Sequence, residues 1–161
     1  MYDVMFDDLE VGQEIKHWPR KTITESDNNL FCLLTRNAHP LHSDIRYANT
    51  SQHRKIVVVG TYVFSLVIGM SVPDISGRAI ANLEYNGIEH LEPVFIGDTI
   101  RAESEVIAKV ESKSKKDRGI ITIRTTAFNQ FDKKVLILQR KILLPKRNIQ
   151  LEDEVWFDGR V

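Results

Sequence analysis

The longest apolar run of the chain is IVVVGTYVFSLVIGM, at residues 56–70. Glycine, serine and threonine interrupt it, and it is shorter than the roughly 20 residues that a helix needs to cross a bilayer. From Gly60 onward, large apolar residues recur at helical spacing on one side, and Phe64 and Ile68 fill the other side. Because a helix that is apolar nearly all round has to be enclosed, this run predicts a buried central helix in a soluble protein.

The chain after this helix has the shorter period of β-strands. Residues 99–109, 119–129 and 135–144 are rich in branched side chains and largely alternate, and residues 80–91 are expected to form a further strand. The polar connections between the last three segments look like hairpin turns, so these strands should run antiparallel. The pattern therefore predicts an α+β fold in which an antiparallel sheet curls around one helix.

The composition narrows the class of protein and its surroundings. The chain of 161 residues suits one domain, residues 1–161, with a single core. Lys plus Arg and Asp plus Glu both total 22, so the charges show no footprint for nucleic acid. The only cysteine, Cys32, has no partner for an intramolecular disulfide, which suits a reducing compartment. The N-terminal segment lacks the features of a signal peptide. We therefore expect a cytoplasmic protein with no nucleic-acid or membrane partner.

A polar motif precedes the central helix. Thr24 and Asp27 have the spacing of a capping box, which predicts a helix over residues 25–36. The run TRNAHPLHSD, at residues 35–44, then brings together two histidines, an amide and a carboxylate. Pro40 excludes a regular helix across the two histidines and favours an extended backbone just before it. The polar side chains should therefore project from a turn, as they do in an active-site loop.

This motif resembles the signature of the MaoC-like hydratases, the family of (R)-specific enoyl-CoA hydratases. In that family the run is usually Thr/Ser-Gly-Asp-x-Asn-Pro-x-His-x-Asp, and its first Asp and its His are the catalytic pair. His42 and Asp44 match the signature. Asn37 stands in the place of the catalytic Asp. The resemblance therefore implies the family's site with one carboxylate replaced by an amide.

The resemblance continues over about residues 6–144. The runs VGT at 59–61 and EPVFIGDT at 92–99 match the family, with Val59 in place of a histidine. The run VIGMSVPD at 67–74 is similar to a branch assigned to mesaconyl-CoA or itaconyl-CoA hydration, in which the motif often carries Asn in place of the Asp. The resemblance implies the hotdog fold, an antiparallel sheet wrapped around a central helix, and at least a homodimer. It also implies a hydratase or dehydratase that acts reversibly on a short enoyl-CoA, with no cofactor besides the CoA of the substrate.

Three residues are the candidates for the chemistry. His42 is the first candidate, because histidine is the side chain that exchanges protons most readily near neutral pH. Asn37 cannot accept a proton, but its amide can hold a water molecule by hydrogen bonds. Our hypothesis is that Asn37 orients the water and His42 performs both proton transfers. Gly60, at the start of a buried helix, would let a thioester carbonyl approach backbone N–H groups as an oxyanion site. The alternative for Gly60 is tight helix–sheet packing alone.

Four other residues in or near the motif have two interpretations each. His39 either borders the pocket or holds the loop through a hydrogen bond to the backbone. Asp44 either orients His42 or caps the turn that follows, and the cap is the favoured interpretation. Arg46 and Arg54 either meet the phosphates of CoA or lie in a solvated loop. We expect all four residues to lie at the substrate-binding side of the site.

Two further interpretations concern histidines and aromatic residues. The spacing of His39, His42 and Asp44 also allows a two-histidine, one-carboxylate metal site, but Pro40 and the lack of a fourth ligand argue against it. The remaining histidines are isolated in the sequence, so we expect surface or structural roles for them; they are His17, His53 and His90. The pair Trp156 and Phe157 is expected to cover a sheet edge.

Two other functions stay open at this stage. The missing carboxylate at Asn37 would also suit a non-catalytic protein that binds acyl-CoA or regulates another protein. A thioesterase is the second alternative, because other hotdog proteins cleave acyl-CoA thioesters. Release of a free thiol separates thioester hydrolysis from hydration, which leaves the thioester intact.

Overall fold

A computed structural model of the chain describes residues 2–147 and confirms the predicted helices and strands. In chain order the elements are η1 (Phe6–Asp8), β1 (Glu14–Lys16), β2 (Lys21–Thr22), α1 (Glu25–Thr35), η2 (Pro40–His42), α2 (Ile45–Thr50), α3 (Gly60–Ser71), η3 (Val72–Ser76), β3 (Ala81–His90), β4 (Thr99–Glu111), β5 (Arg118–Phe128) and β6 (Lys134–Pro145). No helix in this part of the chain is long and apolar enough to span a membrane. Trp156 and Phe157 lie outside the described residues.

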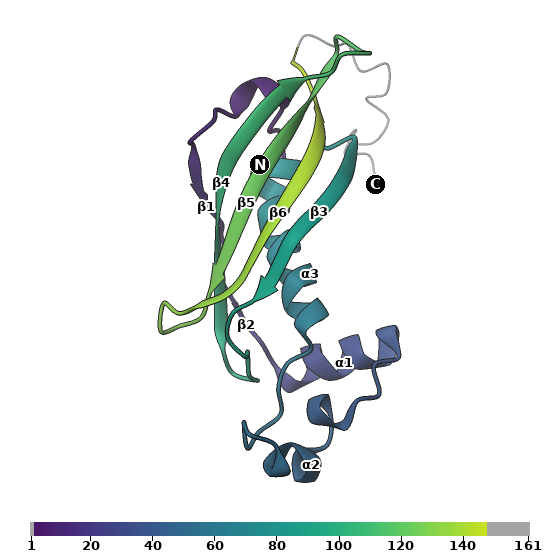
Figure 1. The fold of residues 1–161 in the computed structure, drawn as a ribbon, viewed down its shortest axis with the longest axis vertical. Coiled ribbons are helices and arrows are strands. Elements are labelled where there is room, and N and C mark those ends of the chain that lie inside the picture. Colours follow the sequence, from purple (N-terminus) through teal and green to yellow (C-terminus); the bar gives the residue numbers. More distant parts are fainter. Residues whose placement is uncertain (1, 148–161) are drawn as a thin grey trace, which may run out of the picture.

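The strands form one antiparallel sheet in the order β1, β4, β5, β6, β3, and β2 pairs with β4 as well (Figure 1). Helix α3 runs along one face of this sheet. Val63, Val67 and Met70 of α3 belong to one buried cluster with residues of the long strands, which include Ile100 and Leu138. The predicted α+β class, with an antiparallel sheet against a central helix, is confirmed.

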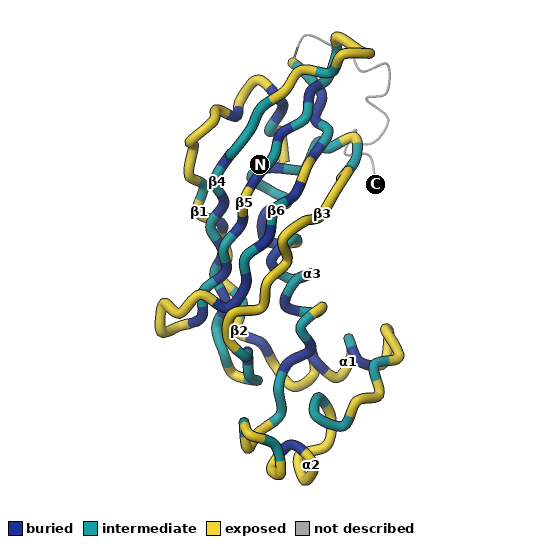
Figure 2. Tube along the Cα trace, viewed as in Figure 1, coloured by how far each residue is buried: buried dark blue, intermediate teal, exposed yellow. Residues whose placement is uncertain are grey.

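Helix α3 is buried on one side only, so the prediction of a fully enclosed helix is wrong for the single chain. Val63 and Val67 face the sheet and are 1% and 0% exposed. Thr61, Ser65 and Gly69, each four residues apart on the other side, are exposed. The reason is geometric, because one curved sheet covers only the face of the helix that is turned toward it. Figure 2 shows that β3, which forms one edge of the sheet, is also exposed along nearly its whole length.

Helix α1 begins and ends as the sequence predicts. Thr24 Oγ1 accepts a hydrogen bond from the backbone N–H of Asp27 at 3.2 Å, and Asp27 Oδ2 accepts one from the N–H of Thr24 at 2.8 Å. This reciprocal pair satisfies two N–H groups that a helix start leaves free. Lys21 Nζ lies 2.8 Å from the same Asp27 oxygen. The helix that precedes the motif loop is therefore fixed at its N-terminus by the capping box.

We expect Asp27→Asn to destabilise the protein by about 1 kcal/mol at neutral pH. Hydrogen bonds from Lys21 and from Thr24 lower the pKa of the Asp27 carboxyl from its ordinary 3.8 to about 2. A lowered folded-state pKa stabilises the protein above the unfolded value, and this contribution is lost as the pH falls toward 2. Urea unfolding of both proteins should therefore show a difference at pH 6 that shrinks below about pH 4. An equal difference at every pH would contradict the role of the charge.

Candidate active site

His42 lines a pocket, and only one of its two ring nitrogens has a hydrogen-bond partner within residues 2–147. This nitrogen, Nδ1, lies 2.7 Å from the backbone oxygen of Val57. A carbonyl oxygen can only accept a hydrogen bond, so Nδ1 carries the proton and donates. In the neutral imidazole, Nε2 is then the unprotonated nitrogen and can act as a base. The backbone thus fixes both the orientation of the ring and the nitrogen that is free to take a proton.

Asn28 joins the His42 loop to the start of α3. The side chain is fully buried; its Nδ2 donates to the backbone oxygen of His42 at 2.8 Å, and its Oδ1 accepts from the N–H of Val59 at 3.0 Å. One amide therefore holds both halves of the site in register. The sequence interpretation missed Asn28. The available signal was its place four residues before buried Cys32, on the inward side of α1.

The first turn of α3 has free backbone donors. Val59 is the N-cap residue, and its side chain makes no capping hydrogen bond. Within residues 2–147 the N–H groups of Gly60 and Thr61 have no acceptor. Free N–H groups at the positive end of a helix dipole favour a negatively charged oxygen. This end of α3 is therefore suited to hold an oxyanion.

A pocket of about 320 Å³ brings these features together. Its walls come from the His42 loop, the start of α3 and the segment that follows β3. The lining residues are His42, His53, Val57, Val58, Gly60, Val63, His90, Leu91, Glu92, Pro93 and Val94. The walls are largely apolar, with a few convergent polar groups, as is common for small-molecule sites. Two of the predicted residues, His42 and Gly60, thus lie in the same pocket.

His53 and His90, for which the sequence predicts surface or structural roles, both line this pocket. They come from segments that are distant in the sequence and close only in the fold. The ring of His53 meets Phe95 edge-on, with 5.9 Å between centroids, and Lys55 Nζ lies 3.7 Å from the centre of the same Phe95 ring. The partial removal of the His90 ring from water lowers its pKa.

Comparison with known proteins identifies the family. Residues 8–127 match the family model described as the MaoC like domain. The chain belongs to the MaoC-like family. It is 36% identical over 143 residues to the mesaconyl-CoA hydratase of Cereibacter sphaeroides. This match covers 89% of this chain and 41% of that protein. It is also 31% identical over 122 residues to the (R)-specific enoyl-CoA hydratase of Aeromonas caviae. That match covers 76% of this chain and 85% of the relative.

A solved structure shows the fold. A conserved hypothetical protein of Mycobacterium tuberculosis, described as a double hotdog fold, matches with a TM-score of 0.83 and 22% identity. The match covers 92% of this chain and 46% of that one. The chain therefore has the hotdog fold, and it spans about two fifths of the length of the Cereibacter relative.

The other residues of the MaoC-like motif shape the loop and do not line the pocket. Asn37 Oδ1 accepts a hydrogen bond from the N–H of His39 at 3.2 Å. His39 Nδ1 accepts one from the N–H of Leu41 at 3.2 Å, so the loop-holding interpretation of His39 is confirmed. Asp44 Oδ1 accepts from the N–H groups of Arg46 and its neighbour Tyr47, so the cap is confirmed as well. These hydrogen bonds set the turn that carries His42.

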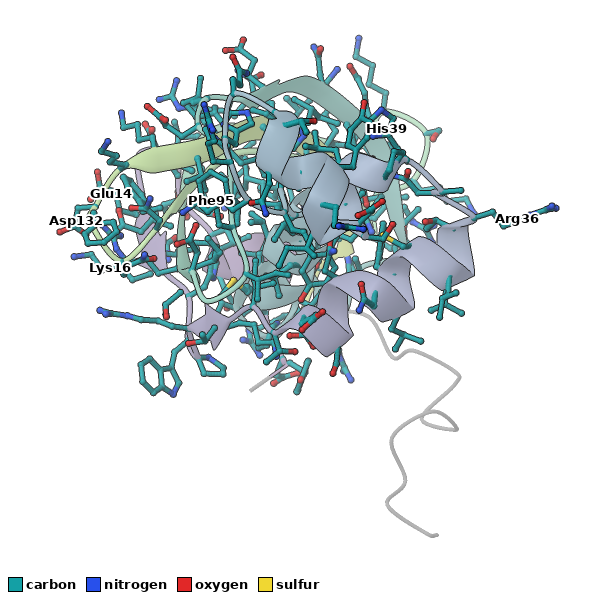
Figure 3. All side chains as sticks on the ribbon, turned by 90° about the horizontal axis from the view of Figure 1, so that it is seen from below. Glu14, Lys16, Arg36, His39, Phe95 and Asp132 are labelled. Atoms are coloured by element: carbon teal, nitrogen blue, oxygen red, sulfur yellow. The ribbon has the colours of Figure 1, made fainter. Side chains whose placement is uncertain are left out.

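The basic residues around the motif lie outside the pocket. Arg46, in α2, and Arg54, on the loop between α2 and α3, are both exposed and do not line the pocket. Arg36, which stands where the family signature has Gly, has a φ of 58° and points away from the protein (Figure 3). Glycine adopts that left-handed conformation without steric cost. Arg36 is therefore a capping position at the end of α1.

The metal-site alternative finds no support in the part of the chain that the structure describes. Among residues 2–147 no three His, Cys, Asp or Glu side chains are arranged to hold a metal ion. The physical reason lies in the loop itself, since Asp44 turns toward the N–H groups of α2 and His42 Nδ1 toward a carbonyl.

Proposed function

We propose that the chain is an acyl-CoA hydratase or dehydratase that adds water reversibly to the double bond of a short enoyl-CoA. One observation carries this proposal: His42, whose Nε2 is free, and Gly60, whose backbone N–H is free, line the same pocket. A base and an oxyanion site are the two groups that addition of water to a conjugated thioester requires. The family and the activities named for the relatives support the same reaction.

The proposed chemistry follows from these two groups. The thioester oxygen lies near the N–H groups of Gly60 and Thr61, and His42 Nε2 takes a proton from water as its oxygen attacks the β-carbon. Negative charge then builds on the thioester oxygen, where one positioned donor contributes about 3 kcal/mol. His42 returns the proton to the α-carbon. Asn37 does not line the pocket of the single chain, and its role in the proposal is that its Nδ2, which makes no hydrogen bond within residues 2–147, orients the water when substrate is bound. The thioester itself delocalises the charge, so the reaction needs no metal or redox cofactor.

The proposed substrate is a short enoyl-CoA thioester. The acyl group is short, and candidates with a second carboxylate are mesaconyl-CoA and itaconyl-CoA, since one relative is named a mesaconyl-CoA hydratase. Arg46 and Arg54 are proposed to meet the phosphates of CoA, with His39 and Asp44 holding the loop at the same side.

We propose a cytoplasmic location for the protein. The unpaired, buried Cys32 supports a reducing compartment.

Isotope-labelled water tests this function against both alternatives. The protein is incubated with crotonyl-, mesaconyl- or itaconyl-CoA in H₂¹⁸O, and the products are analysed by mass spectrometry. A hydratase yields an intact hydroxyacyl-CoA with ¹⁸O in the acyl chain. A thioesterase yields free CoA and ¹⁸O in a carboxylate. Recovery of unchanged thioester that binds tightly to the protein would instead identify a non-catalytic acyl-CoA binding protein.

Asn37→Ala is expected to lower kcat about tenfold, the equivalent of one hydrogen bond of about 1.4 kcal/mol. The substitution removes the amide that orients the water and the oxygen that holds the turn at His39. Asn37→Asp is the complementary variant, because it keeps an oxygen for the turn at His39 and replaces the amide with a carboxylate, which can accept a proton as the Asp of the family signature does, so its kcat should not fall as that of Asn37→Ala does. Steady-state kinetics with crotonyl-CoA measure both variants. Parent-like activity in Asn37→Ala would exclude the proposed role.

We also propose that the working form is at least a homodimer. Strand β3 is a long, exposed sheet edge, and such edges are usually covered or paired. It exposes large apolar side chains, namely Leu83, Tyr85 and Ile88. The M. tuberculosis protein, with its double hotdog fold, is about twice as long as the part that this chain matches. Light scattering should give at least twice the 18.5 kDa of one chain, and a monomer at all concentrations would refute the proposal.

A further inference from the structure

His90 lies against the start of the central helix. It is the last residue of β3, whose end lies beside the first turn of α3 (Figure 1). A Cβ atom built on Gly60 would lie 3.1 Å from both Cε1 and Nε2 of the His90 ring. The ring therefore occupies the space that Gly60 leaves open. It stands beside Gly60, whose free backbone N–H belongs to the proposed oxyanion site.

The ring nitrogens of His90 have no hydrogen-bond partner within residues 2–147. His42 is different, because its Nδ1 is bound to the backbone. The ring is held by packing against Gly60, in a pocket wall, with its polar atoms available to a bound molecule. An available imidazole in a largely apolar pocket is suited to interact with a polar group of the substrate.

The surroundings of His90 favour the neutral imidazole. His90 is an exposed residue of β3, and the partial screening of its ring from water at the pocket wall lowers its pKa; the positive end of a helix dipole also disfavours a positive charge beside it. A neutral imidazole has one N–H group, which can donate to a carbonyl oxygen that gains negative charge. A neutral histidine at a helix N-terminus polarises the substrate carbonyl in triosephosphate isomerase in this way.

We propose that His90 is a further catalytic residue, whose imidazole N–H donates a hydrogen bond to the thioester oxygen together with the backbone at Gly60. The inference rests on the proposed function, because it assumes that a thioester occupies the pocket. It assigns different tasks to the two histidines. His42 moves the protons of water, and His90 stabilises the charge that develops on the thioester oxygen. No proton leaves His90 during the reaction.

A vibrational measurement tests this task without turnover. Butyryl-CoA has no double bond and cannot be hydrated, and a ¹³C label in its thioester carbonyl identifies the C=O stretch by infrared difference spectroscopy. Hydrogen bonds to the oxygen lower this stretching frequency. We expect binding to the parent protein to lower the C=O stretching frequency clearly relative to butyryl-CoA in water, and binding to His90→Phe to lower it less. His90→Gln, which retains an N–H donor, should recover part of the shift, and His42→Ala should leave it unchanged.

The kinetic expectation is a roughly 100-fold lower kcat for His90→Phe with crotonyl-CoA, the usual effect of removing one oxyanion donor. Equal carbonyl shifts in the parent and in His90→Phe would overturn the proposal, even if the parent hydrates crotonyl-CoA. A shift that depends on His90 in a protein that does not hydrate the substrate would support the carbonyl contact and refute the proposed function. Butyryl-CoA that binds without any shift would overturn the contact as well.

Discussion

His42→Ala is expected to lower kcat for crotonyl-CoA hydration by about 10³-fold. The substitution removes Nε2, the nitrogen that the hydrogen bond to Val57 leaves free for the attacking water. The N–H groups at the start of α3 remain, so binding of butyryl-CoA should be unchanged. Steady-state kinetics and calorimetric binding measure the two effects separately. Activity within tenfold of the parent would show that another group takes the proton.

A matched variant separates the chemistry of His42 from its structural role. His42→Asn retains a side-chain N–H group that can donate to the Val57 oxygen and removes the basic nitrogen. We expect parent-like unfolding together with the activity loss of His42→Ala. If His42→Asn were active and His42→Ala inactive, the side chain would serve only to hold the loop.

Asn28→Leu is expected to destabilise the protein by about 3 kcal/mol, because it leaves one buried and one partly buried backbone group without partners. These groups are the oxygen of His42 and the N–H of Val59, which the Asn28 amide joins. The His42 loop and α3 then lose their common support, so kcat should fall by more than tenfold at a temperature where the variant is folded. Urea unfolding and steady-state kinetics provide the two measurements.

The adjacent residue provides the control for Asn28. Asn29 is exposed on the same turn of α1, and Asn29→Leu should change the free energy of unfolding by less than about 0.5 kcal/mol. Equal destabilisation by the two substitutions would mean that the loss comes from the helix and not from the hydrogen bonds between loop and α3.

The sequence predicts elements well where a period is long enough to read. The three longest strands alternate over ten residues or more, and their predicted bounds lie within two residues of the observed ones. Strands β1 and β2 were missed, because segments of three and two residues contain no period. The apolar pattern of α3 predicts burial on every side. It cannot say whether the covering surface belongs to the same chain or to a second copy.

The site was predicted where it is contiguous in the sequence and missed where it is not. The motif loop and Gly60 could be found from local spacing and family resemblance. His90 and Asn28 belong to the site because the end of β3 and the inward side of α1 both meet the start of α3. No local sequence pattern predicts which strand end contacts which helix. Asn37 keeps its predicted catalytic role as a proposal, and its observed contact is the turn at His39.

The most direct test of the account is the ultraviolet absorbance of the conjugated thioester in crotonyl- and mesaconyl-CoA after the parent protein is added. A free-thiol assay runs in parallel on the same samples. We expect loss of absorbance without thiol release, since water adds to the double bond and the thioester stays intact. Unchanged absorbance with both substrates, despite measurable acyl-CoA binding, would contradict this expectation and identify a binding protein.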